Sequence, residues 1–124
     1  MPSGEQRVRA VRGAIRVAED SADAILSATE RLLATLLQRN GIRPEDIVSA
    51  FFTATDDLVA AFPAEAARRM GLGGIPLMCA REIPVAGAMP RVVRTLVHFH
   101  TERSQTEVVP AYLDGAESLR DDLG

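Results

Sequence analysis

The sequence has no tryptophan and only 4% aromatic residues among its 124 positions, so its core must be built from aliphatic side chains. Its single cysteine excludes an internal disulfide, and its first ten residues lack the apolar stretch of a secretory signal. No apolar run reaches the roughly 18 residues that span a bilayer. These absences predict a cytoplasmic protein that makes no membrane contact.

Motifs for common cofactors are absent as well. A net charge of -3 with interspersed signs leaves no basic stripe, so nucleic acid is not an expected partner. There is no glycine-rich phosphate loop, CxxC or HExxH. His98 and His100 share a strand face but lack a third placed ligand, so we predict no metal site. The remaining composition, 47% hydrophobic and 25% charged, is typical of one globular domain over residues 1–124.

Apolar spacing predicts an α+β fold with a mixed β-sheet packed on one long and one short helix. The expected strands cover 7–17, 47–54, 75–81 and 91–100, with a short edge strand near Pro110; the helices run from Asp20 or Ser21 to Gly41 and from Pro63 to Gly71. The strands are apolar on both faces, although helices can cover only one. We therefore expect the other sheet face to pack on another subunit of a symmetric oligomer.

Two arginines lie inside predicted strands. Period-two alternation puts Arg94 on the face of Val92 and Leu96, and Arg12 among small apolar neighbours on the first strand. Burying a guanidinium without an anion is costly. The pattern indicates either structural ion pairs or a pocket for a small molecule with several negative charges, and it leaves both open.

Three further polar residues are ambiguous by pattern alone. Cys79 is more typical of a small buried hydrophobe than of a reactive thiol, because no base is placed beside it. Glu82 ends a strand before a proline-containing loop, and Tyr112 suits a core rim or a ligand donor. Because Cys79 and Glu82 fall on opposite strand faces, both can reach one ligand only if the strand ends or bulges near Arg81.

Four segments together resemble the trimeric AroH-type chorismate mutase family: VRGAI, TATDDLVAAFPAEAAR, PLMCAREIPVAGAMPRVVR and AYLDGAESLRDDL. They span nearly the whole chain in the family's order. The resemblance implies a homotrimer that looks like an α/β-barrel, with active sites between subunits. It also implies the rearrangement of chorismate to prephenate, in the shikimate route to phenylalanine and tyrosine, with no cofactor or metal.

The resemblance also implies roles for individual residues. Arg94 would donate to the breaking ether oxygen and to a carboxylate, which makes it the main electrostatic catalyst. Glu82 and Cys79 would contact the ring hydroxyl and the ring, where positive charge develops. Arg12 and Tyr112 would hold the enolpyruvyl carboxylate.

Other positions are implied to come from a second subunit or from the C-terminus. Phe62 of the neighbouring subunit would pack against the substrate ring, and Arg68 of that subunit would attract the substrate carboxylates. Leu119 and Arg120 would lie on a mobile C-terminal segment, about 115–124, that covers the site. The chain departs from the family at Glu65, where a lysine is usual, and at Met78, where a smaller polar residue is usual.

Two alternatives use the same arginines differently. A trimeric enamine/imine deaminase of similar fold would use a pocket arginine for a carboxylate and a positioned water. A non-catalytic sensor of an aromatic-pathway metabolite would bind without turnover.

Overall fold

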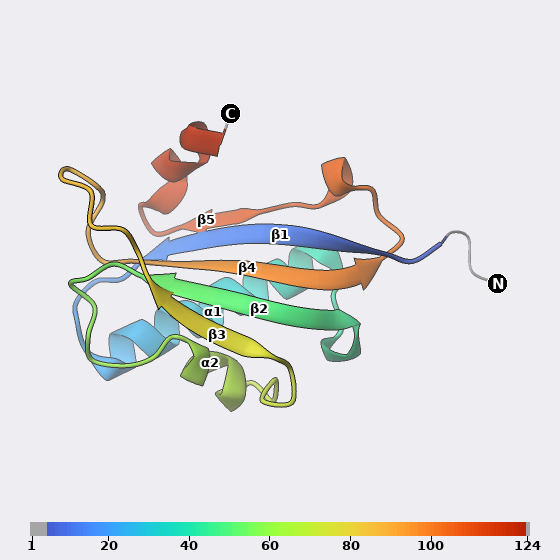
Figure 1. Cartoon of the computed structure of the whole chain (residues 1–124), viewed down its shortest axis with the longest axis horizontal. Helices are drawn as coiled ribbons and strands as arrows, with labels where there is room; N and C mark the ends of the chain where they lie inside the picture. The colour runs from blue at the N-terminus through green and yellow to red at the C-terminus, as the bar shows by residue number, and fades with distance from the viewer. Residues whose placement is uncertain (1–4, 124) are drawn as a thin grey trace.

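The structure is a computed structural model that describes residues 5–123, and side chains through residue 119. Its strands are β1 (Arg7–Arg16), β2 (Ile47–Ala54), β3 (Leu77–Arg81), β4 (Val92–Thr101) and β5 (Ala111–Leu113). Its α-helices are α1 (Ala22–Asn40) and α2 (Ala64–Arg69), and short 3-10 turns are η1 (Pro44–Asp46), η2 (Gln105–Glu107) and η3 (Ala116–Leu123). The predicted order of strands and helices is confirmed (Figure 1).

All five strands form one mixed sheet in the order β3-β2-β4-β1-β5. The central strand β4 runs antiparallel to both β1 and β2, whereas the edge strands β3 and β5 run parallel to their neighbours. This register sets Arg94 between Ala14 of β1 and Thr53 of β2. A mid-sheet arginine is therefore flanked by one small and one hydroxyl side chain.

Both α-helices cover the same face of the sheet, which is the far side in Figure 1. Helix α1 begins at the Ser21 cap, whose hydroxyl accepts a hydrogen bond from the Ala24 amide at 3.1 Å. It ends at Gly41, which adopts a left-handed φ of 59°. Its leucines pack on the buried alternate positions of the strands, among them Ile15, Phe52 and Phe99. The hydrophobic core lies between helices and sheet.

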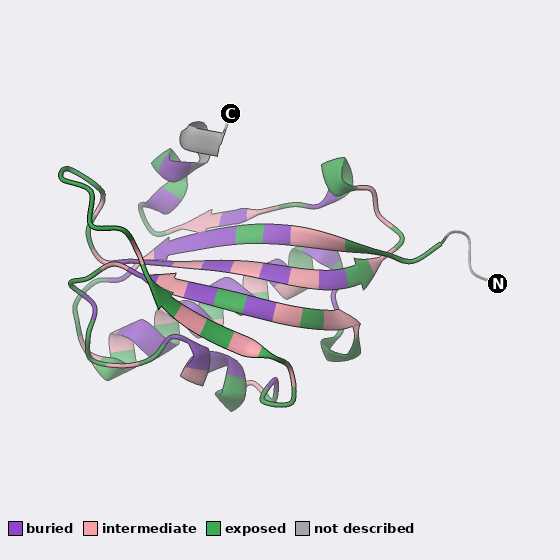
Figure 2. Ribbon diagram, viewed as in Figure 1, coloured by how far each residue is buried: buried purple, intermediate pink, exposed green. Residues whose placement is uncertain are grey.

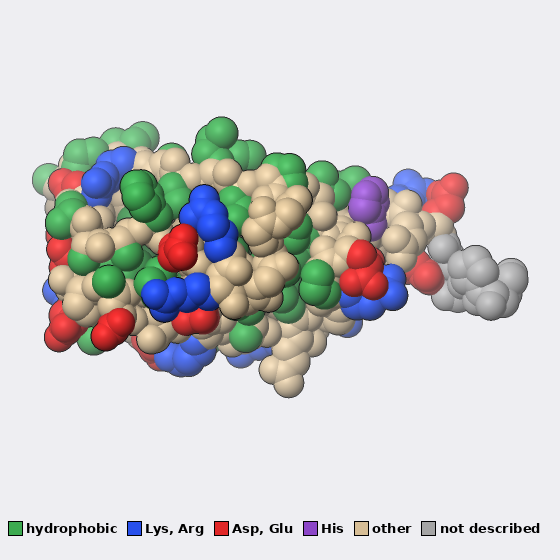
Figure 3. Space-filling model, turned by 90° about the horizontal axis from the view of Figure 1, so that it is seen from below, with side chains coloured by type: hydrophobic (Ala, Val, Ile, Leu, Met, Phe, Trp, Pro, Cys, Tyr) green, Lys and Arg blue, Asp and Glu red, His purple; other side chains and the backbone are tan. Residues whose placement is uncertain are grey.

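The opposite sheet face has no α-helix over it, and exposed positions recur along its strands (Figure 2). Phe51 on β2 and Met78 on β3 are partner residues in the register, so they share this face, and both are exposed. Figure 3, viewed from the side of α2 and β3, shows hydrophobic side chains at the surface between scattered charges. The predicted α+β class is confirmed, while the trimer stays a prediction.

The C-terminal segment folds back onto the uncovered face. Ala116 and Leu119 of η3 are buried against Ala14 and Val92, beside Tyr112. The mobility predicted for this segment stays a prediction, and Arg120 lies outside the residues whose side chains are described. None of the helices within residues 5–123 is long and apolar enough to cross a membrane.

Candidate functional site

A cavity of about 290 Å³ opens on the uncovered face of the sheet, and we call it the Arg94 cavity. It brings together four of the residues singled out in the sequence, which come from different segments: Arg12 of β1, Glu82 after β3, Arg94 of β4 and Tyr112 of β5. Its other lining residues are Gly13, Ala14, Phe51, Thr53, Thr95 and Leu96. The sheet register thus gathers side chains that lie up to a hundred positions apart in the sequence.

The Arg94 guanidinium lies beside a carboxylate. Its Nε is 3.2 Å from an Oε atom of Glu82, and the Thr53 hydroxyl donates a short hydrogen bond to the same oxygen. The Arg94 Nε is buried and has no well-directed hydrogen bond to a described acceptor, so its contact with Glu82 is an ion pair by distance alone. The Arg94 side chain remains 39% exposed, which leaves it accessible to a ligand from the cavity.

Arg12 and Tyr112 complete the polar lining. Both residues lie close to Ala14. Arg12 precedes Ala14 by two positions on β1, and Tyr112 is the register partner of Ala14 on β5. Arg12 is exposed, and no described side chain pairs with it. The cavity therefore offers two cations, one carboxylate and one phenol around an apolar wall, a combination suited to a small anion with a ring.

Cys79 is not part of this cavity. It is the register partner of Phe52, whose side chain belongs to the core, and it packs against that core from the helix-covered face. Strand β3 ends at Arg81, but the Glu82 amide still donates to the Ala54 carbonyl at 3.0 Å, which continues the extended alternation. Although β3 ends before Glu82, Cys79 and Glu82 therefore still lie on opposite faces of the sheet within one chain.

A second cavity, the Phe62 cavity of about 360 Å³, contains Cys79 and Phe62. It shares no lining residue with the Arg94 cavity. Phe62 precedes α2 and is 74% exposed, so its ring is free to meet another molecule. Arg68 lies on the exposed side of α2 and pairs with Glu65 at 3.2 Å. Four predicted site residues thus line the Arg94 cavity and two, Cys79 and Phe62, line the Phe62 cavity, whereas Arg68 and Leu119 line neither.

Thr53 is a site residue that the sequence reasoning missed. Period-two alternation puts it on the same face as Phe51, but only the pairing of β2 with β4 shows that it lies opposite Arg94. Thr53, Phe51 and Leu96 would have been found by applying strand alternation to β2 and β4 once their register was known.

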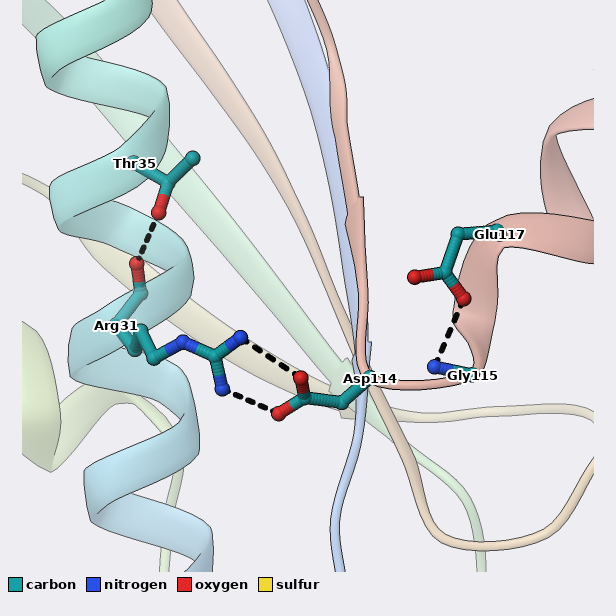
Figure 4. A network of polar contacts seen from close by, with 5 residues as sticks. All are labelled: Arg31, Thr35, Asp114, Gly115 and Glu117. Carbon is teal, nitrogen blue, oxygen red and sulfur yellow. Dashed lines mark hydrogen bonds and ion pairs between the residues drawn. The ribbon is translucent and has the colours of Figure 1, made fainter.

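The turn after β5 is held by an ion pair with helix α1 (Figure 4). Arg31 donates to both carboxylate oxygens of Asp114, one of them at 2.7 Å, and these hydrogen bonds lower the pKa of Asp114. The next residue, Gly115, has a left-handed φ of 98°, and its amide donates to Glu117 at 2.8 Å. This turn directs η3 toward the Arg94 cavity. Among the described residues, no three His, Cys, Asp or Glu side chains cluster to hold a metal ion.

Comparison with known proteins identifies relatives over most of the chain. The family model for chorismate mutase type I matches residues 8–123. The chain is 49% identical to chorismate mutase AroH of Thermus thermophilus over 117 residues, covering 94% of this chain and 96% of that protein. The AroH of Bacillus subtilis is 35% identical, with coverage of 94% and 92%. A solved chorismate mutase from Clostridium thermocellum superposes with a TM-score of 0.87 at 41% identity, covering 88% of this chain and 97% of that one.

Proposed function

Because the chain belongs to the type I chorismate mutase family, we propose that it catalyses the intramolecular rearrangement of chorismate to prephenate. The observation that carries the proposal is the Arg94 cavity, where two arginines, a carboxylate and a phenol converge on an apolar wall. The reaction serves phenylalanine and tyrosine synthesis. It uses no cofactor or metal, because no group has to be attacked or deprotonated.

Chorismate carries two carboxylates and must be held in a compact, chair-like conformer. Negative charge then develops on the breaking ether oxygen. Arg94 donates to that oxygen, while Arg12 and Tyr112 bind the enolpyruvyl carboxylate and Glu82 binds the ring hydroxyl. Catalysis comes from a fixed conformer and from charges aimed at the transition state, both of which can contribute several kcal/mol.

We further propose that the active site is shared between chains of a homotrimer. Two observations support this: the Phe62 and Arg94 cavities are separate within one chain, and exposed apolar residues lie on the uncovered face. In the assembly, Phe62, Arg68 and Cys79 of one chain complete the Arg94 cavity of the next. Leu119 and Arg120 close the site from the C-terminal segment, and the assembly works in the cytoplasm.

The activity test follows the ultraviolet absorbance of chorismate and the formation of prephenate with purified protein. The expected result is turnover far above the uncatalysed rate. Binding of prephenate without turnover would instead support a sensor, and turnover of short imino acids alone would support a deaminase. The family match disfavours the deaminase.

The shared site has its own test. One variant carries Arg94→Ala and another carries Phe62→Ala with Arg68→Ala, so each damages a different cavity. Mixed trimers from co-expression should contain intact sites at roughly a quarter of their interfaces, because a cyclic trimer pairs unlike surfaces of neighbouring chains. Recovery of activity in the mixture, with a solution mass of three chains, supports the proposal. No recovery, or a monomer that retains full activity, contradicts it.

A further inference from the structure

A third cavity, of about 680 Å³, lies where β1 ends beside helix α1, and we call it the Arg16 cavity. It shares no lining residue with the Arg94 or Phe62 cavities. Three arginines and one aspartate line it, from four different segments of the chain: Arg16, Arg31, Arg91 and Asp114. The proposed chemistry uses none of these side chains, so their convergence needs a separate explanation.

The charges of this cavity are unbalanced. Its single carboxylate, Asp114, is already bound by Arg31 through two hydrogen bonds (Figure 4). The guanidinium of Arg16 makes no hydrogen bond or ion pair with any side chain described through residue 119, and its Nε is buried without an acceptor. Arg16 as a whole is only partly buried, but a guanidinium nitrogen that is buried without an acceptor is unfavourable. The cavity is therefore electrostatically suited to an anionic ligand.

Arg91 is held in place for such a ligand. Its backbone adopts a left-handed φ of 54°, and its amide donates to both carboxylate oxygens of Asp57 at 3.1 and 3.0 Å. Its side chain is fixed by a hydrogen bond from Nε to the Val17 carbonyl at 2.9 Å. Its terminal nitrogens make no hydrogen bond or ion pair with a described residue. A strained backbone that is held this firmly is typical of functional sites.

The rest of the lining is small and largely apolar. It consists of Val17, Ala18, Ala24, Ser27 and Ala28. The short side chains of α1 leave space for an apolar body, and the volume lies within the range of small-molecule sites. From the unbalanced cations and the small apolar lining, we infer that the Arg16 cavity binds a small organic oxyanion. The ligand would carry a carboxylate or phosphate group attached to an apolar part, and Arg16 and Arg91 would bind the anionic group.

The test uses the full-length ¹⁵N-labelled protein and two probes, benzoate and phenyl phosphate, titrated separately by NMR. The expected result is saturable shifts of the backbone amides of Val17, Ala24, Ala28 and Arg91. Saturation by only one probe supports the site and identifies the preferred anionic group. Absence of saturable shifts at these amides, or shifts confined to the Arg94 cavity, overturns the inference.

Variants then assign the effect to the two arginines. The double variant Arg16→Gln with Arg91→Gln should weaken binding at least about tenfold, since charge-assisted hydrogen bonds are about twice as strong as neutral ones. Arg16→Lys keeps the charge and should retain the binding affinity within a few-fold. This variant keeps the test informative if the double variant does not fold. Arg69→Gln removes the same charge from the exposed side of α2 and serves as the matched control. Equal weakening by Arg69→Gln, or none in the double variant, would refute the inference.

Discussion

Replacing Arg94 with lysine keeps a positive charge in the cavity but removes the planar fork of N–H donors. In the structure the Nε of Arg94 faces Glu82 at 3.2 Å, and the partly exposed side chain is left to meet the substrate with its other nitrogens. A lysine presents one compact ammonium instead of three separate nitrogens, so it cannot hold Glu82 with one nitrogen while directing another at the ether oxygen. Loss of one such preorganised donor typically lowers kcat by about 100- to 1000-fold, or about 2.7–4 kcal/mol.

The fold should be little affected by the same change. The Arg94 side chain is 39% exposed, and ion pairs of this exposure contribute at most about 1 kcal/mol to stability. We therefore expect Arg94→Lys to unfold close to the wild-type temperature while its kcat drops steeply and its KM changes less.

The assay measures kcat and KM for chorismate together with thermal unfolding. Arg7→Lys is the matched control, because Arg7 lies on β1 outside the cavity and, among the described residues, pairs with the exposed Glu5. That control should retain wild-type kinetics. An Arg94→Lys enzyme within about tenfold of wild type in kcat would refute the role given to the guanidinium, even if the protein is a chorismate mutase.

Three further changes test the frame around the site. Gly13→Ala would put the new Cβ 2.9 Å from a leucine methyl carbon of α1. It should lower the free energy of unfolding, measured in urea, by about 1–3 kcal/mol. Gly74→Ala is the control, because Gly74 has open space around it, and it should lower this free energy far less. Thr53→Val removes the hydroxyl that orients the cavity carboxylate and should lower kcat without lowering the unfolding temperature. Arg31 lowers the pKa of Asp114 in the folded state. The ion pair therefore stabilises the folded state fully at pH values above the pKa of Asp114 in the unfolded chain, about 4, and stabilises it less as the pH falls. Asp114→Asn should therefore destabilise the fold at pH 7, and this effect should shrink as the pH falls below about 4.

Strand alternation was sufficient to predict which faces the two strand arginines occupy. Arg12 and Arg94 lie on the uncovered face, as period two required, because β1 and β4 are regular and ten residues long. Pro110 likewise marked an edge strand, and β5 is at the sheet edge. These features depend on local backbone geometry, which the sequence encodes directly.

Lateral neighbours could not be predicted in this way. Thr53 lies beside Arg94 because β2 pairs with β4 in one register, and a bulge between Ile47 and Ser49 shifts that register. A shift of one residue would have turned Thr53 to the other face. Alternation within a strand carries no information about the partner strand, so Thr53 was missed while Arg94 was found.

The positions of Cys79 and Glu82 link the sheet geometry to the proposed assembly. Three positions separate them, so continued alternation puts them on opposite faces, and the pairing of the Glu82 amide with Ala54 preserves that alternation. No ligand of the Arg94 cavity can contact both side chains within one chain without breaking this hydrogen bond. A second chain removes the conflict, because its Phe62 cavity can face the first chain's Glu82.

If the site is shared as proposed, the same geometry makes catalysis depend on assembly. In an isolated chain the Arg94 cavity opens onto an uncovered sheet face, where water screens the attraction between Arg94 and a developing negative charge. Coulomb attraction between unit charges about 4 Å apart rises from about 1 kcal/mol in water to about 4 kcal/mol in a partly buried site. Covering the exposed Phe51 and Met78 with a neighbouring chain would exclude that water and strengthen each fixed charge. In the proposed assembly, covering Phe51 in the cavity lining and its register partner Met78 would thus determine how strongly Arg94 can act.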